Sequence, residues 1–321
     1  MKEYTISTAG MGIGPDLMKW LCKQFPLREL PESECDKADF VLCDTFRYTW
    51  EKCPGVRILV TAENHPVDLN NFDYCLTHEF VENDRCHRLP YWQYISLFDS
   101  FVRAALTQPR TPLSAEELRA QNRRFCAFVS YNAAAKKRVH MVKNLMKRRE
   151  VSCGGPFLNN IGYCVKDKRA FLKDHLFSVA YENEASPGYQ TEKIVDAFVA
   201  RSIPLYWGSD RVEDEFNPKA FVHARRFRNE AEFVDYVVAL SEDYERMAAM
   251  LNERPIPDPQ ALDKAEAELV AFFTAIFERG AGAVRRTRWQ KFMAFMGHFY
   301  GHGLFRTLRR VTRWMRGKPQ G

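Results

Sequence analysis

The sequence has no C-x-x-C pair, although its 321 residues include nine cysteines. An odd count without paired spacing argues against a disulfide framework and against a zinc knuckle. No apolar run follows a basic start at the N-terminus, so we expect neither a signal peptide nor a transmembrane anchor. Reduced thiols in a cytosolic protein fit these absences best.

Metal-binding motifs are missing as well. The chain has no D-x-D triad, and its eight histidines form neither H-E-x-x-H nor another ligand spacing. We therefore expect no metal site.

Acidic residues are absent from one part of the chain. From Arg279 to Gly321 the sequence has eleven Lys or Arg residues and no Asp or Glu, so the overall charge of +6 belongs to this tail. The remainder is net acidic and carries no nucleic-acid-binding motif, which argues against a nucleic acid partner.

Short apolar runs alternate with amphipathic segments, which predicts an α/β fold with two doubly wound domains. The expected strands are 38–43, 56–62 and 124–130; the expected helices are 16–25, 134–148, 261–280 and one that runs from near Glu230 to the proline-rich segment 253–259. Segment 107–124, with prolines and many charges, is interpreted as the inter-domain connection. We assign residues 1–110 to a first domain, 120–258 to a second, 260–280 to a helix that packs back on the first domain, and 284–321 to a basic amphipathic tail.

The most informative segment is 181–209, YENEASPGYQTEKIVDAFVARSIPLYWGS, which predicts a strand, a loop, a helix and a second strand. Lys193 falls in the first turn of the helix, with Thr191 as a plausible N-cap. A cation there opposes the helix dipole, so we expect an anion at this helix end. Strand-to-helix turns of α/β proteins hold phosphates, which indicates a nucleotide diphosphate site. An ordinary βαβ unit explains the apolar side chains of the helix but not Lys193.

The same segment resembles the signature of the α1,3-fucosyltransferases, which are family 10 glycosyltransferases. The matching residues are Tyr189, Thr191, Glu192, Lys193, Asp196 and Ala197, then Ile203, Pro204, Leu205, Tyr206, Trp207 and Gly208, then Phe216, Asn217, Pro218 and Lys219. Weaker similarity runs back to residue 56. The resemblance implies the GT-B architecture of two Rossmann-like domains that face each other across a cleft. It also implies transfer of L-fucose from GDP-fucose to a sugar hydroxyl with inversion of the anomeric centre.

The resemblance assigns donor-binding residues. Arg138 stands where the family has a diphosphate-binding arginine, and we favour it over Lys136 and Lys137, which a solvated basic face would explain. Glu192 is expected to accept hydrogen bonds from the ribose hydroxyls. The remaining predicted donor-binding residues are Asn183, Tyr189, Lys193, Gly154 and Gly155, although a plain turn also explains the two glycines. Helix ends with Arg138 and Lys193 would stabilise the leaving diphosphate, which leaves a divalent ion at most a stimulatory role.

Glu63 is the predicted general base. It follows an apolar run and therefore lies at the carboxyl end of a predicted strand, where α/β proteins bind ligands. The string TAENHPVDLNNFDY resembles the family's E-N-x-P segment, and by that resemblance Glu63 takes the proton of the acceptor hydroxyl. Asp68, Asp73 and Glu79 are rivals with weaker claims.

The tail has two apolar stripes, Trp289, Phe292, Met293 and Met296 and then Leu304, Leu308, Val311 and Met315, beside an arginine face of Arg306, Arg309, Arg310 and Arg313. This pattern is typical of an interfacial helix on an anionic membrane, although a helix that docks on protein would share it.

We expect a cytoplasmic enzyme, peripheral at the inner face of the cytoplasmic membrane, that uses GDP-fucose and an oligosaccharide or lipid-linked glycan. The family habit favours the 3-hydroxyl of GlcNAc or Glc. Two alternatives stay open: a transferase for another GDP-sugar, or a non-catalytic sugar-binding relative.

Overall fold

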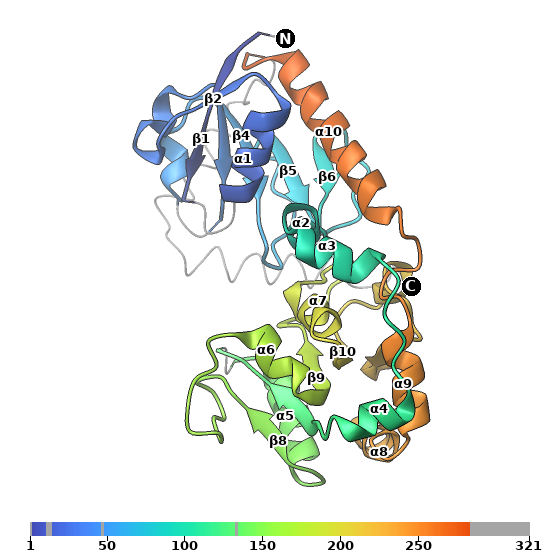
Figure 1. The fold of residues 1–321 in the computed structure, drawn as a ribbon. Helices are drawn as coiled ribbons and strands as arrows, with labels where there is room; N and C mark the ends of the chain where they lie inside the picture. Colours follow the sequence, from blue (N-terminus) through green and yellow to red (C-terminus); the bar gives the residue numbers. More distant parts are fainter. Residues whose placement is uncertain (1, 11–14, 46–47, 132–133, 283–321) are drawn as a thin grey trace, which may run out of the picture.

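The computed structural model describes residues 2–10, 15–45, 48–131 and 134–282, which form two α/β domains placed end to end in Figure 1. Each domain is built around its own parallel sheet. The predicted basic tail, 284–321, lies outside the described residues, so the structure does not test it.

The first domain has a six-stranded sheet in the order β2-β1-β3-β4-β5-β6, with every neighbouring pair parallel. Its strands are β1 Tyr4–Ala9, β2 Leu27–Glu29, β3 Phe40–Cys43, β4 Val56–Val60, β5 Tyr74–Thr77 and β6 Cys86–Arg88. One face packs against α1 Pro15–Gln24, α2 Tyr91–Phe98 and α10 Ala261–Arg279. The other face packs against the 3₁₀ segment η1 Glu32–Lys37 and residues in and beside η2 Tyr48–Lys52. Because both faces are covered, β3 and β4 consist entirely of buried residues.

The second domain has a five-stranded parallel sheet in the order β11-β10-β9-β7-β8. Its strands are β7 Arg124–Phe128, β8 Val151–Cys153, β9 His175–Tyr181, β10 Ile203–Trp207 and β11 Val222–His223. One face packs against α4 Ala115–Ala120, α5 Lys136–Met146, α8 Glu230–Leu240 and α9 Tyr244–Asn252. The other packs against α6 Lys168–Lys173 and α7 Glu192–Val199. Two more 3₁₀ segments are η3 Val212–Asp214 and η4 Ala224–Arg226.

Most of the predicted elements are present. The strands expected at 38–43, 56–62 and 124–130 are confirmed as β3, β4 and β7, and the helix expected at 16–25 is α1. The single helix expected from Glu230 to the prolines is wrong, because α8 ends at Leu240 and Asp243 caps a new helix by accepting a hydrogen bond from the Arg246 N–H.

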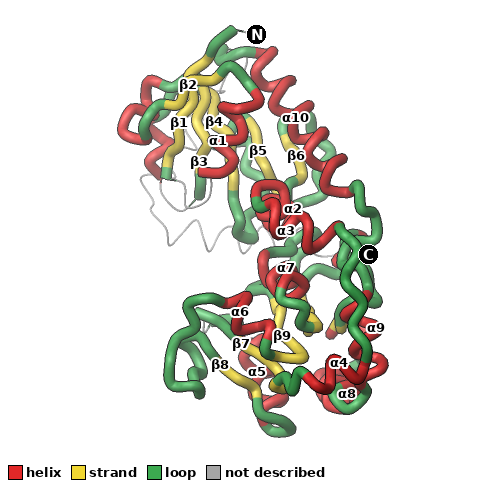
Figure 2. Tube along the Cα trace, in the orientation of Figure 1, coloured by secondary structure: helices red, strands yellow, loops and turns green. Residues whose placement is uncertain are grey.

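Segment 107–124 runs from α3 Ser100–Thr107 to β7 and contains α4, which the sequence interpretation missed. Ser114 and Glu117 form a capping box at the start of α4, a signal that could have revealed it. The chain passes between the domains in the loops before α4 and before α10 (Figure 2).

Helix α10 follows the second domain in sequence but packs on the first. Its apolar face, with Phe273 and Phe277, joins the core around Phe25 and Phe40, and the Phe277 ring centroid lies 4.9 Å from that of Phe40. Figure 1 shows α10 running along the first domain from the inter-domain region toward the N-terminus. In the part of the chain that the structure describes, no helix is long and apolar enough to cross a membrane.

Candidate functional site

The carboxyl ends of the two sheets carry the predicted site residues. Glu63 follows β4, and Glu182 and Asn183 follow β9 directly. A hydrogen bond of 2.9 Å from Asn64 Nδ2 to Glu184 Oε2 joins the loops after these two strands. Because ligands of open parallel sheets bind at this edge, the arrangement brings Glu63 to the same ligand-binding face as the start of α7.

Helix α7 begins with a capping arrangement that sequence reasoning missed. Thr191 is at the N-cap position, as predicted, but its side chain makes no capping hydrogen bond to the helix. Instead the carboxylate of Glu182 accepts the Thr191 N–H at 2.8 Å and the Thr191 hydroxyl at 2.7 Å. A carboxylate directly after a buried strand was the available signal for Glu182, since strand ends are where α/β proteins place functional groups.

Lys193 is held by carboxylates of the protein itself. Its Nζ lies 3.1 Å from Glu182 Oε2 and 3.3 Å from Glu192 Oε1, and it donates to the Thr191 hydroxyl oxygen at 2.9 Å. Burial alone would lower the pKa of Lys193, but the two carboxylates outweigh it and raise that pKa above its ordinary value. Burial opposes the Glu192 charge in the same way, yet Lys193 and Lys168 hold the pKa of Glu192 below its ordinary range.

Arg138 is the residue of its basic run that turns into the site. Its Nε donates to the Tyr181 carbonyl at 2.9 Å, Nη1 to the Ser130 hydroxyl at 3.1 Å, and Nη2 to Asn183 Oδ1 at 2.6 Å. Burial lowers the pKa of the Arg138 guanidinium. Lys136 and Lys137 are exposed on the same first turn of α5, and no acidic residue occupies that turn. A buried guanidinium held at three points presents its remaining N–H groups in a fixed direction.

The loop before α7 leans on the first domain. Gly188 has a φ of 78°, and a Cβ added there would lie 2.2 Å from the His78 carbonyl oxygen. Tyr189 packs its ring edge-on to His78, with centroids 5.2 Å apart, and burial raises the pKa of its hydroxyl. Only glycine fits both the backbone angle and the close approach, which explains the glycine of the Pro-Gly-Tyr string.

Glu63 keeps access to solvent, but its carboxyl group is partly enclosed. This partial burial raises the pKa of Glu63, with Lys193 acting in the opposite direction and Glu192, Asp44 and Glu182 adding to the rise. The charge of Lys193 therefore acts on Glu63 from the opposite domain, and the predicted base and the predicted phosphate ligand belong to one electrostatic site.

The three rival carboxylates have structural partners within the first domain. Asp73 accepts the Arg57 N–H at 2.8 Å, Glu79 accepts the Val67 N–H at 3.1 Å, and Asp68 accepts from the Asn71 amide at 2.8 Å. These contacts lie in and beside β4 and β5.

Gly154 and Gly155 follow β8 and are buried. A Cβ on Gly155 would lie 2.2 Å from the Ser130 carbonyl oxygen, and one on Gly154 would lie 2.4 Å from a methyl group of Val165. Close packing within the second domain therefore already requires both glycines.

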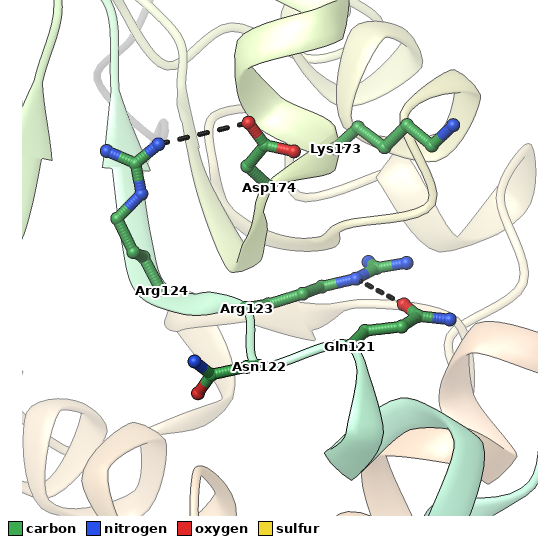
Figure 3. A pocket seen from close by; sticks show the side chains of 6 residues that line it. All are labelled: Gln121, Asn122, Arg123, Arg124, Lys173 and Asp174. Atoms are coloured by element: carbon green, nitrogen blue, oxygen red, sulfur yellow. Dashed lines mark hydrogen bonds and ion pairs between the residues drawn. The ribbon is translucent and has the colours of Figure 1, made fainter.

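A surface pocket of about 440 Å³ lies elsewhere, at the amino-terminal edge of the second sheet. Figure 3 shows its lining side chains, including Arg123, Arg124 and Lys173, with Arg124 directed toward Asp174 at 3.8 Å. Since it is on the edge opposite to the carboxyl ends of β7 and β9, it does not include the predicted site residues. Over the described ranges, no group of three or more His, Cys, Asp or Glu residues is placed to hold a metal ion.

The second domain matches a known protein family. Residues 118–268 match the family described as glycosyltransferase family 10 (fucosyltransferase), C-terminal part. The chain is 32% identical over 252 residues to the alpha-(1,3)-fucosyltransferase FucT of Helicobacter pylori, an alignment that covers 69% of this chain and 53% of that protein. It is 33% identical over 110 residues to a cattle (Bos taurus) 3-galactosyl-N-acetylglucosaminide 4-alpha-L-fucosyltransferase, covering 33% of this chain and 30% of that protein. The chain thus spans about half or less of the length of these relatives.

Solved structures cover both domains. A crystal structure of an alpha1,3-fucosyltransferase with GDP-fucose superimposes with a TM-score of 0.69 at 25% identity, over 87% of this chain and 91% of that one. Anabaena HepE in complex with UDP-glucose gives a TM-score of 0.51 at 10% identity, over 84% of this chain and 99% of that one, a likeness in fold alone. The predicted GT-B architecture is confirmed by the two parallel sheets and these superpositions.

Proposed function

Because the chain belongs to glycosyltransferase family 10, the fucosyltransferases, we propose that it transfers L-fucose from GDP-fucose to a hydroxyl group of a glycan, as an α1,3-fucosyltransferase. The observation that carries this proposal is that Arg138 and Lys193 lie at the carboxyl edge of the second sheet, while the charge of Lys193 acts on Glu63 at the carboxyl edge of the first. The reaction requires a group that binds the diphosphate and a group that accepts a proton. Two cations can bind the diphosphate, and a carboxylate can accept the proton.

On the donor side, the diphosphate would lie between the starts of α5 and α7. Arg138 would contribute its remaining N–H donors, and Lys193 would transfer part of its bonding from Glu182 to a phosphate oxygen. Glu192 would accept from the ribose hydroxyls. Both helix N-termini add partial positive charge, so the site can stabilise the leaving diphosphate without an obligatory metal ion.

On the acceptor side, Glu63 would act as the general base. As the acceptor oxygen bonds to the anomeric carbon of fucose, its proton passes to the Glu63 carboxylate and the bond from that carbon to the β-phosphate oxygen breaks. The electron pair leaves with GDP, and attack from the opposite face inverts the anomeric centre. A base whose pKa is raised toward the working pH accepts a proton more readily, which fits the raised pKa of the partly enclosed Glu63 carboxyl group.

The acceptor that we propose is the 3-hydroxyl of a GlcNAc or Glc residue in an oligosaccharide or lipid-linked glycan. The test is to incubate the purified chain with GDP-fucose or GDP-mannose and a panel of acceptors, and to read product mass and linkage. Fucose in α1,3 linkage supports the proposal. Transfer from GDP-mannose alone indicates another GDP-sugar transferase, and GDP-fucose binding without transfer indicates a non-catalytic relative.

We further propose that residues 284–321 attach the protein to the anionic inner face of the cytoplasmic membrane. The support is sequence alone, namely cations without carboxylates beside apolar residues at helical spacing.

A further inference from the structure

Lys193, one of the two cations of the proposed diphosphate site, already faces carboxylates of the protein. Glu182 and Glu192 both lie within 3.3 Å of the Lys193 ammonium group. The side chain of Glu182 is fully buried, whereas that of Glu192 is 36% exposed. A buried carboxylate is poorly screened by water, so Glu182 acts more strongly on any charge placed beside Lys193.

Glu182 is fixed in place, whereas Lys193 has a flexible side chain. The Glu182 N–H donates to the Trp207 carbonyl at 2.8 Å, and its carboxylate holds both the N–H and the hydroxyl of Thr191. Gly208 packs against its stem so closely that a Cβ there would lie 2.6 Å from Glu182 Cγ. Four rotatable bonds let the Lys193 ammonium group move while Glu182 stays where it is.

We propose that Glu182 is a positioning residue with two effects on the donor site: it holds Lys193 ready in the empty site, and it competes with the diphosphate for that cation so that GDP is released. This inference rests on the proposed function. In the empty site the Glu182–Lys193 pair keeps the ammonium group charged and in place. After transfer, when GDP remains as product, Glu182 offsets part of the attraction between Lys193 and the phosphates and also repels the phosphates directly. The product is therefore bound less tightly than two cations alone would bind it.

The competing explanation is that Glu182 only caps α7. Glu182→Gln separates the two, because the glutamine amide oxygen still accepts the Thr191 N–H while the negative charge is lost. A residue that only caps would leave GDP affinity unchanged or, if the helix frays, weakened. A residue that competes for Lys193 would give tighter GDP binding when its charge is removed.

The experiment compares Glu182→Gln with Glu150→Gln, which removes the same charge from an exposed position in the same domain. Calorimetry gives the GDP and GMP dissociation constants, and steady-state kinetics give kcat and the GDP inhibition constant. We expect Glu182→Gln to tighten GDP binding several-fold, to tighten GMP binding less, and to lower kcat where GDP release limits turnover. Glu150→Gln should match the wild type. Unchanged or weaker GDP binding by a folded Glu182→Gln variant, or equal effects of both variants, overturns the proposal.

A stability cycle decides the matter if Glu182→Gln alone does not fold. Lys193→Met leaves the Glu182 carboxylate buried without its cation, so the melting temperature should fall clearly. Adding Glu182→Gln to Lys193→Met should recover most of that loss; no recovery shows that the pair does not form and overturns the inference. If the wild-type protein itself binds no GDP, the proposed function fails instead, so the two failures are distinguishable.

Discussion

The amide of Asn64 donates a 2.9 Å hydrogen bond to the carboxylate of Glu184, and it does so across the two domains. Asn64 is the immediate neighbour of the proposed base, and Glu184 belongs to the loop between β9 and α7. Arg88 and Trp92 of the first domain both reach Glu215 of the second, at 2.5 Å and 3.1 Å. Contacts between the domains therefore help to fix the position of the proposed base relative to the proposed donor site.

Replacing the base should abolish transfer and spare donor binding. Glu63→Gln keeps the size of the side chain but cannot accept the proton, so kcat should fall by about a hundredfold to ten-thousandfold. GDP affinity, measured by calorimetry, should stay close to that of the wild type. Glu79→Gln is the matched control, because Glu79 also lies beyond a first-domain strand but bonds to the Val67 N–H. If Glu63→Gln keeps more than about a tenth of wild-type kcat, Glu63 is not the base.

The pH dependence of transfer should report Glu63 and its coupling to Lys193. Because the pKa of Glu63 is raised, the rising acidic limb of kcat/KM should lie above the ordinary glutamate value of 4.5. Lys193 lowers that pKa, so Lys193→Gln should move the limb to still higher pH, apart from its effect on rate. Profiles of kcat/KM are the right measurement, since they report the free enzyme. A limb that does not move, or moves to lower pH, contradicts the electrostatic link between the two domains.

The two proposed phosphate ligands should distinguish GDP from GMP. Lys193→Ala and Arg138→Ala each remove a charge-assisted contact, which is worth about 1.5–3 kcal/mol of GDP binding. GMP lacks the β-phosphate and should lose less. Arg138→Lys keeps the positive charge but loses the planar guanidinium group, which can donate two parallel hydrogen bonds, so this variant should bind GDP with intermediate affinity. Equal losses for GDP and GMP would assign both residues to structure alone, and melting temperatures would check that reading.

Gly188→Ala should disturb the contact between the domains. The new Cβ would meet the His78 carbonyl oxygen in addition to the strain of a positive φ, which by itself costs about 1–2 kcal/mol. Gly162→Ala is the control, because Gly162 also has a positive φ, 83°, but a Cβ there meets nothing within 4 Å. Thermal unfolding of both variants isolates the clash, and kcat shows whether it reaches the site. Equal destabilisation by the two substitutions would mean that the backbone at His78 shifts at little cost and that the close approach does not limit residue 188.

Deleting residues 284–321 should abolish sedimentation with anionic liposomes. Each Lys or Arg near such a surface contributes about 1 kcal/mol, and the apolar stripes add burial. Transfer to a soluble oligosaccharide should be nearly unchanged, since the proposed donor and base residues all come before residue 220. High salt should release the full-length protein only in part. An insoluble truncated protein, or one inactive on a soluble acceptor, would place the tail in the fold or in a dimer.

The sequence was sufficient for the fold class and for the position of Glu63, because buried parallel strands give long apolar runs and ligands follow their ends. It was insufficient for Glu182. The helix-dipole argument predicts an anion beside Lys193 at the start of α7, and the nearest carboxylate of the protein belongs to Glu182, eleven residues earlier in the chain. Glu182 and Lys193 come together only when the loop between β9 and α7 folds back, and the spacing of apolar residues along the sequence does not predict this contact.

The second discrepancy is the predicted single helix that the structure divides into α8 and α9, and its cause is a helix cap within the segment. The split between α8 and α9 depends on Asp243, whose side chain caps the second helix, within a stretch whose apolar spacing continues through the break. A capping aspartate inside a continuous amphipathic pattern is a weak signal on its own, because aspartate is also common on solvent-facing helix surfaces.

Helix α10 gives the molecule an unusual order of assembly. On the ribosome, domains generally fold as units and the N-terminal one folds first. Here the sheet of the first domain emerges early, but the aromatic side chains that close its core, Phe273 and Phe277, are among the last described residues to be synthesised. The second domain is complete in sequence before they appear. Phe25 and Phe40 therefore lack their contacts with Phe277 until the second domain has been synthesised, and only then can the core of the first domain close.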